Sequence, residues 1–243
     1  MKAYSLIVFA AILGALLWTN AFLGVPQLAR YSSISHHEPH IYDGTSTIAN
    51  IDLLVVYFVP KDRVATSSDI WIPSVQSAID DLVTFHAVQF QHKSLLHVRL
   101  ETQAITGERS SLEYDTNDTN RGNPSALRSI GDELVERLSV GDLKSLLKTY
   151  SGTMPRLFVV YEGVGSSGSP GGAALINRKF LTDSEYAYYG HSYFAHEFYH
   201  TIGIPDGFND ADQSFTPDIM GLGRRRTLRV NFVAPETLRH CGL

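Results

Sequence analysis

The segment from residue 196 to residue 206 has residue types and spacings that can hold a metal ion. Its sequence is HEFYHTIGIPD. On a helix, residues four positions apart lie on one face, so His196 and His200 can bind one ion from adjacent turns. Neutral imidazole suits zinc. Glu197 would lie beside the ion without having to bind it, and a carboxylate there can accept a proton from water.

The residues that follow predict how a third ligand is supplied. Gly203 can adopt a left-handed conformation and end the helix, and Pro205 prevents the helix from continuing. The chain can then turn back and present Asp206. A random chain of this composition would contain the complete pattern on the order of once in ten thousand cases. A metal site is therefore favoured over a helix whose histidines only pack or cap.

A methionine turn lies downstream, in the sequence Pro217-Asp218-Ile219-Met220-Gly221. Together with this turn, the motif resembles the metzincin class of zinc peptidases. The aspartate in third position is most similar to the snapalysin-like branch, in which aspartate replaces the third histidine. The resemblance implies one catalytic zinc ion and cleavage of a protein or peptide substrate.

The resemblance also implies a role for each residue of the motif. The zinc ligands that it implies are His196, His200 and Asp206. Glu197 would be the general base, and the Met220 side chain would underlie the metal site. Leu222 stands where some relatives have a tyrosine, two residues after the methionine, so the sequence offers no tyrosine to stabilise the transition state. The one cysteine, Cys241, lies near the C-terminus, which excludes a latency switch based on an N-terminal cysteine.

Other interpretations of the site stay open at this point. Glu236 could supply a distant third ligand, and three aspartates in the following loop are rivals of Asp206. These aspartates are Asp210, Asp212 and Asp218. The chain could also be an inactive envelope protein that binds zinc or a partner, although the intact Glu197 favours an enzyme. A third alternative is hydrolysis of an amide in a non-protein envelope substrate.

The elements that must position the motif follow an alternating order. Strands are predicted over 51–59, 94–102, 156–162 and 173–177, and helices over 71–90 and from 125 to about 150. This order predicts a mixed α/β (α+β) fold with a mostly parallel twisted sheet, crossover helices and an active-site helix. The resemblance adds an antiparallel edge strand that holds the substrate, which we place at Gly171–Ile176, where a glycine- and serine-rich loop at 163–172 ends. The alternative for this segment is a glycine loop that leads into a plain core strand.

The N-terminal residues predict export from the cytoplasm. Residues 1–25 form an apolar segment that is expected to be a cleaved signal peptide or an uncleaved membrane anchor. Residues 26–48 are polar and are expected to be a linker or a short pro-segment. The catalytic domain would then comprise residues 49–243, in a secreted or membrane-anchored protein.

Charge and length limit the partners. The formal net charge is −5 and the isoelectric point is near 6.0. This balance makes a nucleic acid an unlikely partner, and the short basic run Arg224–Arg226 does not change that. The 243 residues are enough for one catalytic domain, and we expect a monomer.

Overall fold

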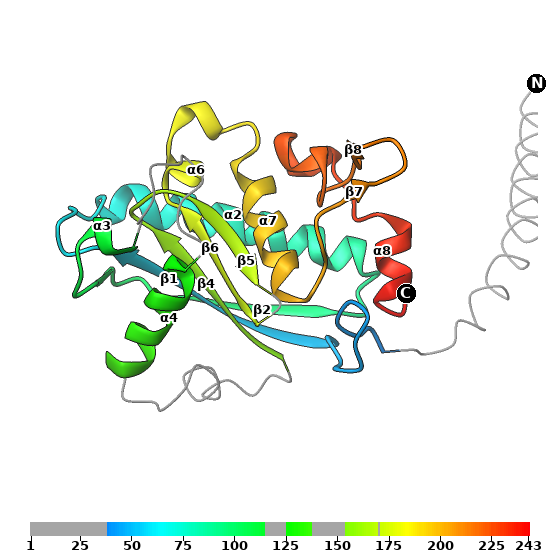
Figure 1. Ribbon diagram of the computed structural model, residues 1–243, viewed down its shortest axis with the longest axis horizontal. Helices are drawn as coiled ribbons and strands as arrows, with labels where there is room; N and C mark the ends of the chain where they lie inside the picture. The colour runs from blue at the N-terminus through cyan, green and yellow to red at the C-terminus, as the bar shows by residue number, and fades with distance from the viewer. Residues whose placement is uncertain (1–37, 115–124, 138–153, 170) are drawn as a thin grey trace, which may run out of the picture. The chain divides into compact units, whose positions relative to one another are not determined.

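The computed structural model describes residues 38–114, 125–137, 154–169 and 171–243 (Figure 1). The predicted leader at 1–25, most of the predicted linker and the later part of the helix predicted from 125 to 150 lie outside these ranges. Within the ranges, none of the helices has the length and apolar character that a bilayer-crossing segment requires.

The secondary-structure elements alternate along the chain much as the sequence predicts. In chain order they are β1 (Asn50–Val59), α2 (Ser68–Gln89), β2 (Leu95–Leu100), β3 (Ile105–Thr106), α3 (Ser111–Tyr114), α4 (Ala126–Arg137), β4 (Met154–Tyr161), β5 (Ser166–Ser169), β6 (Ala173–Asn177), α6 (Lys179–Thr182), η1 (Ser184–Tyr186), α7 (Gly190–Thr201), β7 (Phe208–Asn209), β8 (Ser214–Phe215), η2 (Leu222–Arg225), η3 (Leu228–Val230) and α8 (Pro235–His240).

The main sheet is mixed and mostly parallel. Its strand order is β2-β1-β4-β6-β5, and β3 also pairs with β1. Strands β2, β1, β4 and β6 run parallel to one another, whereas β5 pairs antiparallel with β6. The predicted fold class, a mostly parallel sheet with an antiparallel edge strand and crossover helices, is confirmed.

The identity of the edge strand differs from the prediction. The segment expected to form the antiparallel edge, Gly171–Ile176, instead leads into β6 (Ala173–Asn177), an inner strand that pairs parallel to β4. The edge is β5, within the segment predicted as a glycine- and serine-rich loop. The physical reason is burial: Ala174, Leu175 and Ile176 are all buried, so this strand needs cover on both faces, which an inner strand of the sheet has. A polar strand is suited to an edge.

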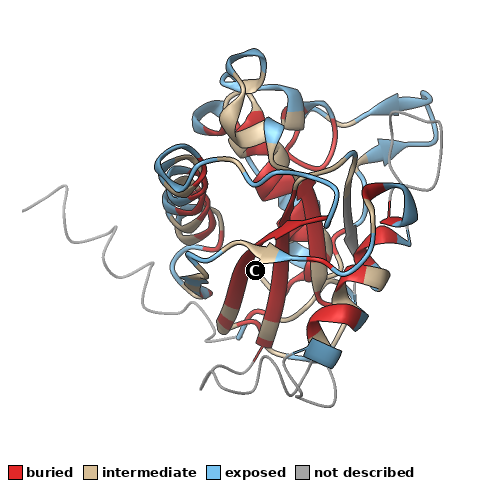
Figure 2. Cartoon of the chain, turned by 90° about the vertical axis from the view of Figure 1, so that its left-hand side faces the viewer, coloured by how far each residue is buried: buried red, intermediate tan, exposed pale blue. Residues whose placement is uncertain are grey.

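Both faces of the sheet are covered by helices, which explains the nearly unbroken apolar sequence of its inner strands. Helices α2 and α7 cover one face and α4 covers the other (Figure 1). Alternate residues of β1 enter the two cores, with Val55 and Tyr57 on the α7 side and Val56 and Phe58 on the α4 side. Figure 2 shows the inner strands of the main sheet coloured mostly as buried, whereas the short β7–β8 pair is exposed.

The segment before β1 is attached to the C-terminal part of the chain. The His40 amide donates to the Cys241 carbonyl over 2.9 Å, and the Tyr42 amide donates to the Ile202 carbonyl over 3.1 Å. Ile48 is fully buried in the core that also contains α7. Residues 38–48, the described part of the predicted linker, therefore contact the C-terminal end of α7, the helix that carries the motif.

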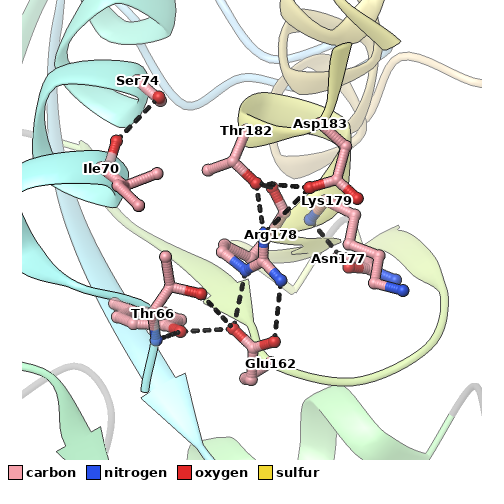
Figure 3. A network of polar contacts seen from close by, with 10 residues as sticks. Thr66, Ile70, Ser74, Glu162, Asn177, Arg178, Lys179, Thr182 and Asp183 are labelled. Atoms are coloured by element: carbon pink, nitrogen blue, oxygen red, sulfur yellow. Dashed lines mark hydrogen bonds and ion pairs between the residues drawn. The ribbon is translucent and has the colours of Figure 1, made fainter. Parts of the chain in front are cut away.

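A polar network joins the ends of three segments on the side of α6 (Figure 3). Glu162, just after β4, accepts two hydrogen bonds from Arg178, over 2.7 and 3.0 Å. The same carboxylate accepts hydrogen bonds from the Tyr57 and Thr66 hydroxyl groups. This network fixes the connection from β6 to α6, through which the chain proceeds to α7.

Candidate metal centre

Helix α7 carries the motif on a firmly packed element. Its apolar side chains Phe194, Ala195 and Phe198 are fully buried in the larger core, and the Phe194 and Phe158 ring centroids lie 4.1 Å apart. At its first residue, Gly190, an added Cβ would lie 1.8 Å from the Phe180 carbonyl oxygen. A glycine is therefore required where the helix begins against α6.

The two histidines are held in one tautomer by main-chain carbonyl groups. His196 Nδ1 lies 3.0 Å from the Ile219 oxygen, and His200 Nδ1 lies 2.8 Å from the Ile204 oxygen. A carbonyl oxygen only accepts, so each Nδ1 carries the hydrogen and each Nε2 presents a lone pair. Metal-binding histidines are oriented by contacts of this kind.

The end of α7 positions both His200 and Asp206. Gly203 has a φ of 89°, and its amide donates to the His200 carbonyl, while the Ile204 amide donates to the Tyr199 carbonyl. This pair of hydrogen bonds is a Schellman motif, which ends the helix and reverses the chain. The reversal places the Ile204 carbonyl on His200 and brings Asp206 back toward the two imidazoles, as the spacing predicts.

The three predicted ligand atoms form a compact triangle. The two Nε2 atoms are 3.2 Å apart, and Asp206 Oδ1 lies 3.4 Å from that of His196 and 3.7 Å from that of His200. A tetrahedral zinc site with ligand distances of about 2.1 Å has ligand–ligand separations of about 3.4 Å. The donor set therefore fits a zinc ion in both chemistry and size.

Glu197 is a second acidic side chain beside this triangle. One of its carboxylate oxygens lies within 4.8 Å of the ligand nitrogens of both histidines, so His196, Glu197 and His200 also form a group able to hold a metal ion. Asp206 is closer to both imidazoles and is half exposed, whereas Glu197 is 5% exposed. The shorter distances favour Asp206 as the third ligand.

The surroundings of Glu197 suit a proton acceptor. Burial raises the pKa of its carboxyl group to about 7, although a hydrogen bond with the Ser166 hydroxyl lowers it. The negative charge of Asp206 raises this pKa and the positive charge of Arg224 lowers it. An acid with a pKa near neutrality can both accept and release a proton under ordinary conditions.

His196 stays neutral in this environment. Burial and the neighbouring His200 and Arg224 lower the pKa of His196 to about 3. An imidazole must be unprotonated to bind a metal ion. The electrostatics of the site therefore keep this Nε2 available as a ligand.

Arg224 also reaches the triangle. Its Nη1 lies 3.0 Å from Asp206 Oδ1 and 3.2 Å from His196 Nε2. The guanidinium carbon lies 5.3 Å from the centre of the Phe215 ring. The sequence predicts no role for this residue beyond its membership of a short basic run.

The other acidic candidates are engaged elsewhere. Asp218 is buried and accepts hydrogen bonds from the Thr216 hydroxyl and the Ala234 amide. Asp212 accepts hydrogen bonds from the Ser214 amide and hydroxyl groups in the β7–β8 hairpin. The remaining two, Asp210 and Glu236, are exposed, and Glu236 pairs with Arg239.

Met220 is buried in the core on the α7 side of the sheet. The carbonyl of the preceding residue, Ile219, is the one that orients His196. The methionine turn therefore acts on the site through its main chain. A role for the Met220 side chain beneath a metal ion stays a prediction, as does zinc binding by the triangle itself.

Sequence reasoning missed Ser166, Arg224 and the two carbonyl groups. Ser166 lies in a polar strand that the sequence presents as a loop, and a main-chain oxygen has no sequence signal of its own. Arg224 lies in η2, directly after the methionine turn, and the sequence marks it only as part of the basic run Arg224–Arg226.

Comparison with known proteins gives a limited result. No model of a protein family matches this sequence, and no curated protein matches it significantly. Among solved structures, the fold is similar to the crystal structure of metalloproteinase-II from Bacteroides fragilis, with 13% sequence identity and a TM-score of 0.45. The match covers 82% of this chain and 53% of that one, so this chain spans about half the length of that protein. What the site can do follows from its own side chains.

Proposed function

We propose that this protein is a zinc-dependent endopeptidase. The observation that carries the proposal is the triangle of His196, His200 and Asp206, whose donor atoms have the separations of a tetrahedral zinc site. A zinc ion held there would polarise the scissile carbonyl group and lower the pKa of water to about 7. His196, His200 and Asp206 would hold the ion, and a set of three protein ligands is typical of catalytic zinc sites.

Glu197 would act as general base and then as general acid. It accepts a proton from the water molecule whose oxygen forms a bond to the carbonyl carbon of the peptide. When the carbon–nitrogen bond breaks, its electron pair stays on nitrogen, and Glu197 returns the proton to that nitrogen. The products are a carboxylate and an amine, and no electron acceptor or donor is needed.

The neighbouring edge strand supports a peptide as the substrate. Strand β5 is the last strand of the sheet, and among the described elements it pairs with β6 alone. An exposed edge offers main-chain donors and acceptors to an extended peptide. Ser166 of β5 is hydrogen-bonded to Glu197, so a peptide added to this edge would lie next to the general base.

The setting of the enzyme belongs to the same proposal. We propose a monomer that acts on proteins or peptides outside the cytoplasm, either secreted or anchored by its N-terminal segment. Nucleic acid has no part in this function. The net charge of −5 and the apolar residues at 1–25 support these points.

Metal analysis and cleavage of a labelled peptide library, with and without a chelator, test this function. We expect one zinc ion per chain and cleavage that the chelator abolishes. Glu197→Gln should keep the zinc and lose at least about 100-fold in kcat/KM. Asp206→Ala should lose zinc affinity, and Glu236→Gln, which changes an exposed acid on α8, should behave like wild type.

Two outcomes would favour other functions. Normal cleavage by Glu197→Gln would show that another group is the base. If the wild type binds zinc but cleaves no peptide in the library, the protein is either a non-catalytic binding protein or a hydrolase of a non-protein amide.

A further inference from the structure

Arg224 is held in place by a rigid turn beside the donor triangle. It lies in η2, and the amide groups of Gly221 and Gly223 on either side of Leu222 both donate to the Asp218 carbonyl. The buried Asn231 side chain donates to the Gly223 carbonyl over 2.7 Å. An added Cβ at Gly223 would lie 2.2 Å from the Asn231 Oδ1, so only glycine allows this close packing.

The guanidinium group contacts two of the three donor atoms of the triangle. Its Nη1 is 3.0 Å from Asp206 Oδ1 and 3.2 Å from His196 Nε2, which is close to the separations among the three donors themselves. An oxygen atom of a substrate bound at this site would therefore lie within reach of the same side chain. The Arg224 side chain is 21% exposed, so it acts in a partly dry environment, where charge interactions are strong.

Most of the donor capacity of this arginine remains for a substrate. A guanidinium group has five N–H donors, and both contacts with the triangle use Nη1. Within the described ranges, no residue accepts a hydrogen bond from Nη2 or Nε.

We propose that Arg224 is a catalytic residue that donates hydrogen bonds to the carbonyl oxygen of the scissile peptide bond as negative charge develops on it. This inference rests on the proposed peptidase function. A planar donor group next to a developing oxyanion stabilises the transition state more than the ground state.

The test compares Arg224→Met and Arg224→Lys with the matched control Arg225→Met, which removes the same charge from an exposed position in the same turn. In zinc-loaded protein we expect Arg224→Met to lower kcat about 100- to 1000-fold with little change in KM. Arg224→Lys should recover part of the loss, and Arg225→Met should match wild type.

A binding measurement separates this role from a structural one. A phosphinic peptide, whose tetrahedral anion resembles the transition state, should bind zinc-loaded Arg224→Met about 100-fold more weakly by calorimetry. We also compare Glu197→Gln with the double variant that adds Arg224→Met. The dissociation constants of an uncleaved peptide substrate should differ by less than about threefold between these two proteins. Zinc content should be the same in all variants.

Other outcomes would overturn the proposal in distinguishable ways. Unchanged kcat and unchanged phosphinic-peptide affinity would exclude the catalytic role of Arg224 and leave the peptidase function standing. Activity that returns when zinc is saturating would show that Arg224 only positions Asp206. A wild-type protein without zinc-dependent cleavage would overturn this inference together with the proposed function. If Arg224→Met does not fold, Arg224→Lys, which keeps the charge but loses the planar donor group, should show a smaller loss of both kcat and phosphinic-peptide affinity, and no loss of either would exclude the role.

Discussion

At the scale of single residues, Glu197 shows how one side chain is prepared for proton transfer by its surroundings. Burial alone would leave it protonated at neutral pH, because it raises the pKa of the carboxyl group. The Ser166 hydroxyl and the charge of Arg224 oppose that effect. The resulting pKa of about 7 is a balance of groups from three separate parts of the chain.

This balance predicts the effect of Ser166→Ala. Removal of the hydroxyl takes away a hydrogen bond that stabilises the charged carboxylate, so the pKa of Glu197 should rise. A general base must be ionised, and the acidic limb of kcat/KM should therefore move to higher pH, by less than about one pH unit. The pH–rate profile of Ser166→Ala checks this, with Ser74→Ala as control, because the Ser74 hydroxyl lies on α2 and bonds only to the Ile70 carbonyl among the described residues. A limb that moves to lower pH would contradict the assignment.

How well the site can be predicted depends on how far apart its residues lie along the sequence. The relation of His196 to His200 is fixed by the helical repeat, and the position of Asp206 follows from a glycine that ends the helix. Both are local properties that spacing encodes. Ser166 and Arg224 approach from a different strand and a later turn, and their positions depend on how these elements pack.

At the scale of elements, the end of α7 carries more of the site than its length suggests. The Schellman motif at Gly203 determines the chain path to Ile204, and the Ile204 carbonyl orients His200. The φ of 89° at Gly203 is one that other residues adopt only at a cost. The conformation of this one glycine therefore affects both where α7 ends and which ring nitrogen of His200 carries the hydrogen.

Gly203→Ala should weaken both stability and metal binding. We expect a loss of about 1–2 kcal/mol in the free energy of unfolding, because alanine is strained in this conformation. Zinc affinity should fall roughly tenfold as the Ile204 carbonyl moves away from His200. Denaturant unfolding and a competitive chelator measure the two effects.

Gly131→Ala is the matched control. This glycine lies inside α4, and an added Cβ would meet no atom within 4 Å. Alanine there should raise the free energy of unfolding by up to about 1 kcal/mol and leave zinc affinity unchanged. Equal losses in the two variants would show that the conformation at Gly203 is not the cause.

The strands were predicted correctly where burial gives the sequence an apolar pattern, and wrongly where it does not. Strands β1, β4 and β6 are apolar because helices cover both faces, and the sequence shows this directly. Strand β5 has the sequence SSGS, which has the composition of a turn. Its strand conformation depends on pairing with β6, so a sequence pattern could not reveal it.

At the scale of the whole molecule, two cores on opposite faces of one sheet stabilise the fold. The Glu162 network joins the segments that follow β4 and β6 to each other. Partial burial works to raise the pKa of Glu162, but the hydrogen bonds from Arg178 and Tyr57 outweigh it. The pKa therefore lies below its ordinary value of 4.5. The ionised, paired form thus stabilises the folded state.

The sign of the pH dependence follows from that shift. Stability from this pair should be fully present above about pH 4.5 and should be lost as the pH falls through the lower pKa of the folded protein. Glu162→Gln should reduce the free energy of unfolding at pH 7 by about 2 kcal/mol and flatten its decline at acidic pH. Unfolding curves from pH 7 to pH 3 test this, with the exposed Glu136→Gln as control. A decline as steep as in the wild type would show that other carboxylates govern acid unfolding.

The main-chain partners of His196 and His200 have a consequence for how this site withstands mutation. The Ile204 and Ile219 oxygens belong to every residue type alike, so no replacement at those two positions can delete them. A change in chain length between the end of α7 and Ile204 would displace the oxygen that orients His200, and one within the methionine turn would displace the oxygen that orients His196. Genetic drift should therefore spare the orientation of the imidazoles through many point substitutions and destroy it through a single insertion or deletion.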